Sequence, residues 1–184
     1  MPKLLASIAA LALGAAPALA TGIEIDVAGE AQGTITIDLF EDVAPQHVAR
    51  IVELAETGAY DEVVFHRVID GFMAQTGDVQ YGVAGSDMSL AGTGGSEQPD
   101  LEAEFSDRSF DRGTVGMARS ADPDSANSQF FIMFAPAPHL DGQYTIVGEV
   151  TEGLDVLDAI KRGEGANGAV IGEPDRMEAV RVID

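Results

Sequence analysis

An arginine at position 67 is followed closely by an aromatic ring, a thioether and an amide, at Phe72, Met73 and Gln75. A guanidinium is permanently charged and carries five N–H donors. Its hydrogen bonds are strong where apolar neighbours exclude water. Apolar side chains and an amide beside this donor predict a surface site that binds by apolar contact and directed hydrogen bonds. The alternative is a solvated surface arginine, because long cationic side chains usually extend into water.

A second amide and aromatic pair occurs in the stretch QFFIMF, which starts at residue 129. Successive side chains of a strand point to opposite faces, which divides this stretch into two sets. One set is wholly apolar and is expected in the core: Phe130, Ile132 and Phe134. The other set places Gln129 beside Phe131, and so predicts a face with an apolar floor and amide hydrogen-bonding groups. The alternative is that the glutamines only hydrogen-bond loop backbone.

Other kinds of chemistry find little support in the sequence. The chain has no cysteine, which excludes thiol nucleophiles, disulfides and cysteine-ligated zinc. Its three histidines lack the paired spacing of metal ligands, and the acidic stretch DPDSANS lacks the ligand ladder of a calcium loop. No nucleophile stands beside a base, so hydrolysis is not indicated. We therefore expect neither a metal nor a cofactor.

The formal charge of the chain is −21. An acidic surface of this kind repels phosphate backbones and anionic lipid. Nucleic acids and membrane surfaces are therefore not expected partners.

Residues 1–20 are predicted to be a signal peptide. Lys3 gives a positive start, an apolar run follows, and Ala18-Leu19-Ala20 fits the small-residue cleavage rule. The run is short for a membrane span, although an uncleaved anchor is the alternative. The remaining 184 − 20 = 164 residues, 21–184, suit a single domain with its own core. We expect an exported, periplasmic monomer that is not inserted in the membrane once the leader is removed.

The elements that must position the site read mostly as strands. Alternating apolar residues at 23–27 and 35–39, separated by a Gly29–Gly33 turn, predict an antiparallel hairpin. Further strands are expected from residue 63, at 113–119, 129–134, 144–150 and 177–183, and residues 82–100 read as a long ordered loop. Helices are predicted at 44–57 and 151–162. This order fits a mainly β, closed antiparallel barrel capped by two helices.

Three side chains outside the site receive specific expectations. His47 falls on the polar side of the first helix and is expected at the solvated surface. Asp158 is expected to pair with Arg162 one turn along the second helix. His66 has the opposite parity to Arg67, and is expected to be a hydrogen-bonded core residue inside the barrel.

Two long motifs, FHRVIDGFMAQTGD from residue 65 and GTVGMARSADPDSANSQFFIMFAPAPHLDGQYTIVGEV from residue 113, resemble the cyclophilin-type peptidyl-prolyl cis–trans isomerases. The resemblance runs through nearly all of the chain after the leader. It implies an eight-stranded antiparallel barrel with a groove on its outer surface, proline-containing polypeptides as substrates, and Arg67 as the catalytic arginine. We expect Gln75 to orient Arg67. The remaining groove residues that the resemblance implies are Phe72, Met73, Ala118, Arg119, Gln129, Phe131, His139, Leu140 and Tyr144.

Two positions depart from the pattern of eukaryotic members. His139 stands where those members have tryptophan, and Tyr144 stands where they have histidine. Tight cyclosporin binding is therefore not expected, whereas isomerase activity is. The alternative to an active isomerase is a non-catalytic binding or chaperone module that holds proline-containing segments in the same groove.

Overall fold

The computed structural model describes residues 21–184, so the predicted leader lies outside the described residues. The strands are β1 Gly22–Ala28, β2 Gly33–Leu39, β3 Val63–Val64, β4 Arg67–Ile69, β5 Met73–Thr76, β6 Thr114–Met117, β7 Phe130–Met133, β8 Ile146–Glu152 and β9 Arg176–Ile183. The α-helices are α1 Pro45–Glu56 and α2 Leu154–Ala159, and the short 3-10 turns are η1 Met88–Leu90, η2 Pro138–Leu140 and η3 Ala166–Gly168.

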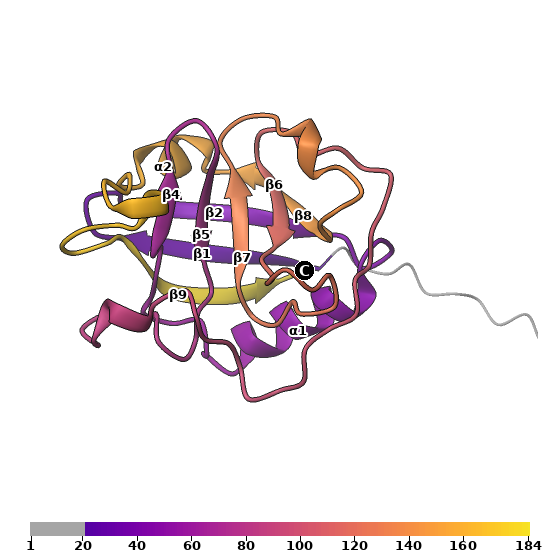
Figure 1. The fold of residues 1–184 in the computed structure, drawn as a ribbon, viewed down its shortest axis with the longest axis horizontal. Helices are drawn as coiled ribbons and strands as arrows, with labels where there is room; N and C mark the ends of the chain where they lie inside the picture. The colour runs from indigo at the N-terminus through magenta and orange to yellow at the C-terminus, as the bar shows by residue number, and fades with distance from the viewer. Residues whose placement is uncertain (1–20) are drawn as a thin grey trace, which may run out of the picture.

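The nine strands form one antiparallel sheet in the order β3-β9-β1-β2-β8-β6-β7-β5-β4. The sheet curves back on itself, so that β1, β2 and β9 lie behind β4, β5 and β7 and cross them (Figure 1). The predicted mainly β architecture with antiparallel strands and two helices is confirmed. No ladder is recorded between the outermost strands β3 and β4 in residues 21–184.

The sheet has nine strands because the strand expected from residue 63 is interrupted. Val63 and Val64 pair with β9, whereas Arg67 to Ile69 pair with β5. Phe65 and Val68 both lie in the same hydrophobic core, although an unbroken strand would point them to opposite faces. The break at residues 65–66 therefore resets the alternation and sends Arg67 outward.

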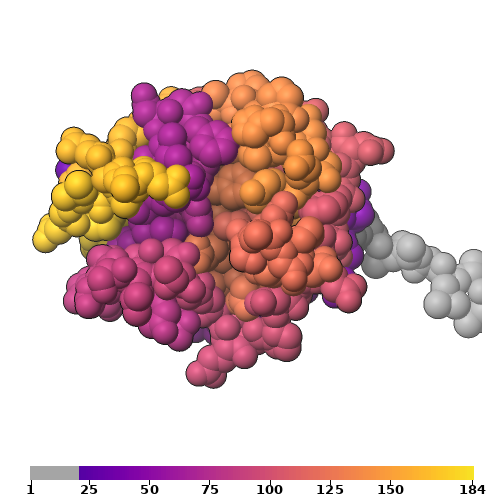
Figure 2. All heavy atoms as spheres, viewed as in Figure 1, coloured from indigo at the N-terminus to yellow at the C-terminus, as the bar shows by residue number. Residues whose placement is uncertain are grey.

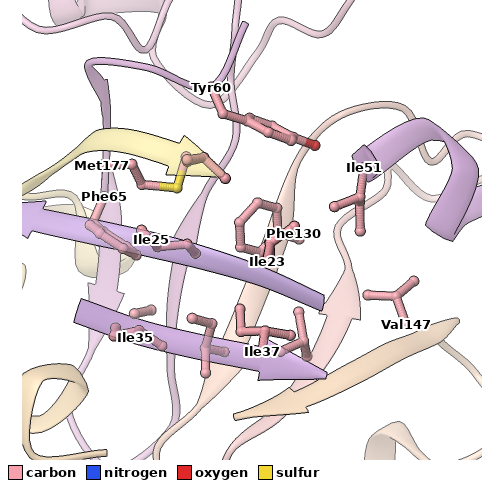
Figure 3. Close-up of a cluster of buried hydrophobic side chains, with 14 of the residues drawn as sticks. Ile23, Ile25, Ile35, Ile37, Ile51, Tyr60, Phe65, Phe130, Val147 and Met177 are labelled. Carbon is pink, nitrogen blue, oxygen red and sulfur yellow. The ribbon is translucent and has the colours of Figure 1, made fainter. Parts of the chain in front are cut away.

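The main core lies on the inner, concave side of the sheet and is built by strand alternation. In the β1–β2 hairpin, Ile23 is paired with Ile37 and Ile25 with Ile35, and all four side chains are buried. Ile51 of α1 and Phe130 of β7 reach toward these isoleucines from other directions (Figure 3). The hairpin, the first helix and the inward face of residues 130–134 are thus confirmed.

The second helix is shorter than predicted. Strand β8 continues to Glu152, and α2 covers only Leu154–Ala159. Arg162 therefore lies beyond the helix, and the expected pair with Asp158 is wrong. Asp158 instead forms an ion pair of 2.9 Å with Arg112, and Arg162 pairs with Asp70. No helix in residues 21–184 has the length and apolarity that crossing a membrane requires.

The expectation for His47 is also wrong, because its side chain is fully buried. Its Nδ1 donates to the Glu104 carboxylate at 2.6 Å, and the backbone N–H groups of Gln46 and His47 donate to the same carboxylate at 3.1 Å. Helix α1 has no side-chain cap of its own. Glu104 therefore caps the positive N-terminal end of this helix from a distant part of the chain.

We expect Glu104→Gln to lower the free energy of unfolding by about 1–2 kcal/mol, because the amide keeps one acceptor but loses the charge. Chemical denaturation at neutral pH measures this loss. Burial raises the pKa of Glu104, but hydrogen bonds from His47 and Gln46 outweigh it and leave the pKa below its usual value of 4.5. Because the pKa of Glu104 is lowered, its ionised carboxylate stabilises the folded protein fully above pH 4.5, and protonation at lower pH removes this stabilisation. The difference in unfolding free energy between wild type and Glu104→Gln should therefore shrink as the pH falls below 4.5.

The matched control is Glu102→Gln, which makes the same charge change at an exposed residue nearby. It should change stability by less than about 0.5 kcal/mol. Equal stability of wild type and Glu104→Gln at neutral pH would contradict the capping role.

Candidate functional site

Three predicted site residues lie in a row across the outer face of the sheet. Arg67 of β4 is directly opposite Gln75 of β5, and Gln75 is directly opposite Phe131 of β7. Paired residues of neighbouring strands project to the same side. Arg67 Nη1 accordingly donates to Gln75 Oε1 at 3.1 Å. Strand pairing alone thus places the guanidinium, the amide and the aromatic ring on one face.

The floor beside this row is a second hydrophobic cluster, separate from the main core. Phe131 stacks on Phe110 with ring centroids 5.8 Å apart. The row continues to Gly116 of β6, where a Cβ atom would lie 2.6 Å from Phe110 and 2.7 Å from Phe131. Only glycine at this position lets both rings pack against the sheet. The other buried members of the cluster are Phe40, Met73, Met133, Ala137, Leu140 and Ile146.

The floor lies in a recess of about 170 Å³, and every residue that lines it belongs to the predicted site. The lining residues are Arg67, Phe72, Met73, Gln75, Ala118, Arg119, Phe131, Leu140 and Tyr144. In Figure 2 the surface is hollowed between the purple segment near residue 70 and the orange segment near residue 140. The fold therefore brings these predicted residues, which come from segments far apart in the chain, together in one recess.

The two remaining predicted residues lie next to the recess. Gln129 accepts a hydrogen bond from Gln75 Nε2 at 2.9 Å, and its own Nε2 donates to the Gly94 carbonyl at 2.8 Å. The loop that contains Gly94 is held by the buried Asp78, whose Oδ2 accepts from the backbone N–H groups of Gly92 and Gly94. An amide chain thus links Arg67 to this loop. His139 stacks on the outer side of the recess, against Phe72, with ring centroids 5.8 Å apart.

Arg119 and Tyr144 form the opposite wall. The Arg119 guanidinium lies 4.2 Å from the centre of the Tyr144 ring, and it donates to the backbone carbonyls of Ser120 and Gln143. Tyr144 meets Phe131 edge-on. The recess is therefore bounded by two guanidiniums, and none of its lining residues is acidic.

The side chain of Arg67 is only partly exposed to solvent. Partial burial lowers the pKa of its guanidinium, although the neighbouring Tyr144 opposes this shift. An arginine remains charged throughout the accessible pH range. A charged donor shielded from water makes stronger hydrogen bonds than one in bulk solvent.

Sequence reasoning missed one contact of Arg67. Its Nε donates to the backbone carbonyl of Asn167 at 2.9 Å, and its Nη2 donates to Asn167 Oδ1 at 3.1 Å. The only signal in the sequence is the turn-forming Asn167-Gly168 pair, which identifies no partner.

His66 differs from its expectation in one respect. It is buried as predicted, but neither ring nitrogen has a hydrogen-bond partner among residues 21–184. Its ring lies against Gly92, whose Cβ position would be 2.9 Å from the His66 ring. Burial lowers the pKa of His66, with the nearby charge of Asp78 opposing. The imidazole is therefore neutral at neutral pH.

The comparisons with known proteins agree with one another. The family model for cyclophilin type peptidyl-prolyl cis-trans isomerase/CLD matches residues 23–182. A probable peptidyl-prolyl cis-trans isomerase of Brucella suis is 56% identical over 147 residues, which cover 79% of this chain and 75% of the relative. A peptidyl-prolyl cis-trans isomerase of Helicobacter pylori is 43% identical over 136 residues, covering 72% of this chain and 78% of the relative.

Solved structures share the fold. The crystal structure of a cyclophilin from Hirschia baltica has a TM-score of 0.69 at 25% identity, covering 86% of this chain and 72% of the other. The structure of a cyclophilin type isomerase from Cryptosporidium parvum, determined in the presence of the dipeptide Ala-Pro, has a TM-score of 0.75 at 24% identity. It covers 89% of this chain and 99% of the other, and it shows the likeness of the fold. The family model spans nearly all of the described residues, and the chain belongs to the cyclophilin-type peptidyl-prolyl cis–trans isomerases.

Proposed function

We propose that this isomerase accelerates rotation about X–Pro bonds without covalent chemistry, using the Arg67 guanidinium at the edge of the apolar recess. The observation that carries the proposal is the arrangement of Arg67. Three of its five N–H groups are bound to Gln75 and Asn167, and two have no partner among residues 21–184. A fixed cation with two free donors borders an apolar floor.

The reaction explains why this arrangement suffices. Rotation passes through a twisted amide roughly 18–20 kcal/mol above the planar form, because resonance is lost. No bond is broken, so neither a nucleophile nor a general base is needed. In the twisted state the prolyl nitrogen becomes pyramidal and accepts a hydrogen bond better than in the planar state. A donor aimed at that nitrogen stabilises the transition state more than the ground state, which is the requirement for catalysis.

The recess is suited to a single small ring. Its volume of about 170 Å³ is below the range of roughly 300–1,000 Å³ that is typical of pockets for whole ligands. Phe131, Met73 and Leu140 supply the apolar surface that would hold the proline ring while the preceding peptide unit rotates. Gln75 would orient Arg67 and meet the rotating carbonyl, and the backbone at Arg119 would hold the peptide extended.

We expect Arg67→Ala to lower kcat/KM roughly a hundredfold, which is the usual cost of removing one donor that stabilises a transition state. Arg67→Lys should recover little, because an ammonium lacks the planar fork of donors. A protease-coupled assay with a chromogenic X–Pro tetrapeptide measures both. Arg181→Ala is the control, because Arg181 is an exposed arginine that pairs with Asp26 on β1. Its activity should equal that of wild type.

The same assay decides between the active isomerase and the alternative, a groove that only binds. If wild type gives no acceleration over buffer while proline peptides still bind, the catalytic proposal is wrong. If Arg67→Ala is folded and fully active, the role of Arg67 is wrong.

The departures at His139 and Tyr144 bear on cyclosporin. We infer weak binding of cyclosporin by wild type, because His139 stacks against Phe72 where eukaryotic members carry tryptophan. We expect His139→Trp to tighten inhibition by cyclosporin at least tenfold, since the larger indole adds apolar contact and an N–H donor. Titration of the isomerase activity with cyclosporin measures this. Equal inhibition of both proteins would contradict the inference.

We further propose that residues 21–184 act as a single-domain monomer and that the sheet closes as a barrel. Closure is supported by the position of β3 and β4. They are the outermost strands of the sheet, and only Phe65 and His66 separate them in the chain.

Export to the periplasm is proposed from the leader-like composition of residues 1–20. We expect N-terminal sequencing of the protein expressed in a Gram-negative host to begin near Thr21, with the protein in the periplasmic fraction. An intact N-terminus in the cytoplasm would contradict export.

A further inference from the structure

One edge of the Arg67 guanidinium is hydrogen-bonded to a single residue, Asn167, of a distant loop. Nε and Nη2 form the side-on fork of an arginine, and Asn167 meets both of them. Its backbone carbonyl accepts from Nε at 2.9 Å, and its Oδ1 accepts from Nη2 at 3.1 Å. A bidentate contact of this kind fixes the plane of the guanidinium as well as its position. Gln75 holds Nη1, so the three contacts together leave the guanidinium one orientation.

The backbone of Asn167 is built for this contact. Its φ of 56° and ψ of 28° lie in the left-handed region, which most residues avoid and asparagine tolerates. In this conformation the backbone carbonyl and the short side-chain amide of the same residue both face Arg67. A β-branched side chain would meet backbone strain here. The residue type and its dihedral angles therefore suit this pair of hydrogen bonds to Arg67.

The loop that carries Asn167 is fastened along β4 on both sides of Arg67. The Val170 N–H donates to the His66 carbonyl at 3.1 Å, and the Gly163 N–H donates to the Val68 carbonyl at 2.8 Å. Next to Asn167, a Cβ atom on Gly168 would lie 2.4 Å from the Ile69 side chain. The loop thus approaches β4 more closely than any other residue type at position 168 would allow. Asn167 is held at a fixed distance from Arg67.

From these contacts we propose that Asn167 is a positioning residue of the isomerase. It acts through Arg67 by fixing the guanidinium so that its two unpartnered N–H groups face the recess. This rests on the proposed catalytic role of Arg67. Because the contact with Asn167 orients a group that acts in the transition state, the loss of this contact lowers kcat and leaves KM nearly unchanged.

Asn167→Gly is the sharpest test, because glycine adopts the left-handed backbone without strain. It keeps the backbone carbonyl contact with Nε and removes the side-chain amide, and with it the Oδ1 that accepts from Nη2. We expect kcat to fall roughly tenfold and KM to stay within about twofold, measured by the protease-coupled assay and by NMR exchange of a proline peptide. Asn167→Asp keeps an oxygen acceptor in place and should stay within about threefold of wild type.

Ala166→Gly is the matched control, because it adds the same flexibility to the same loop without touching Arg67. It should leave kcat unchanged. A loss in Ala166→Gly equal to that in Asn167→Gly would assign the effect to loop flexibility and overturn the proposal. The Nη2–H resonances of Arg67 give a direct readout, since they should exchange faster with water in Asn167→Gly, which lacks the Oδ1 acceptor, than in wild type.

A double-mutant cycle separates this proposal from the proposed function. In the Arg67→Ala background, Asn167→Gly should cause no further loss, because the group on which Asn167 acts is gone. An equal loss in both backgrounds would overturn the positioning role. If Arg67→Ala is impaired and Asn167→Gly is fully active, only the role of Asn167 is wrong. If Arg67→Ala itself is fully active, the role of Arg67 fails and that of Asn167 fails with it.

Discussion

The register of strands β4, β5 and β7 is the constraint on which the site depends. It sets Arg67, Gln75 and Phe131 side by side on the outer face, while their sequence neighbours fill the core. A slip of one residue would exchange the two faces and bury the guanidinium. The same pairing that stabilises the sheet therefore also builds the site. Substitutions in these strands are therefore limited twice, because one face must fill the core and the other must keep the site residues.

The floor of the recess is formed by the second hydrophobic cluster. Phe131 is packed between Phe110 and Tyr144, and its position depends on the missing side chain of Gly116. Side chains held in this way have few alternative rotamers, which gives the apolar surface a fixed shape. The polar half of the site is fixed differently, by hydrogen bonds that run from Arg67 through Gln75 and Gln129 to a loop held by Asp78.

Local pattern predicted the features that depend on alternation, and it failed where distant segments meet. The two faces of residues 129–134 and the β1–β2 hairpin followed from a period of two. The burial of His47 did not, because its partner Glu104 comes from a segment with no periodic signal. Likewise, nothing local indicates that Asn167 touches Arg67, one hundred positions away. The resemblance to a family completed the set of candidate site residues, but of the contacts that hold them only the one between Gln75 and Arg67 was expected.

The remote cap of helix α1 has a consequence for the order of folding. A helix of 12 residues has marginal stability in isolation, and this one lacks a cap within its own sequence. Its N-terminal donors are satisfied only when the segment around Glu104 has arrived, 57 positions later in the chain. Contacts between such distant positions form late, because the intervening chain must first lose its freedom. Helix α1 should therefore become stable only after the segment around Glu104 has packed against its N-terminal end.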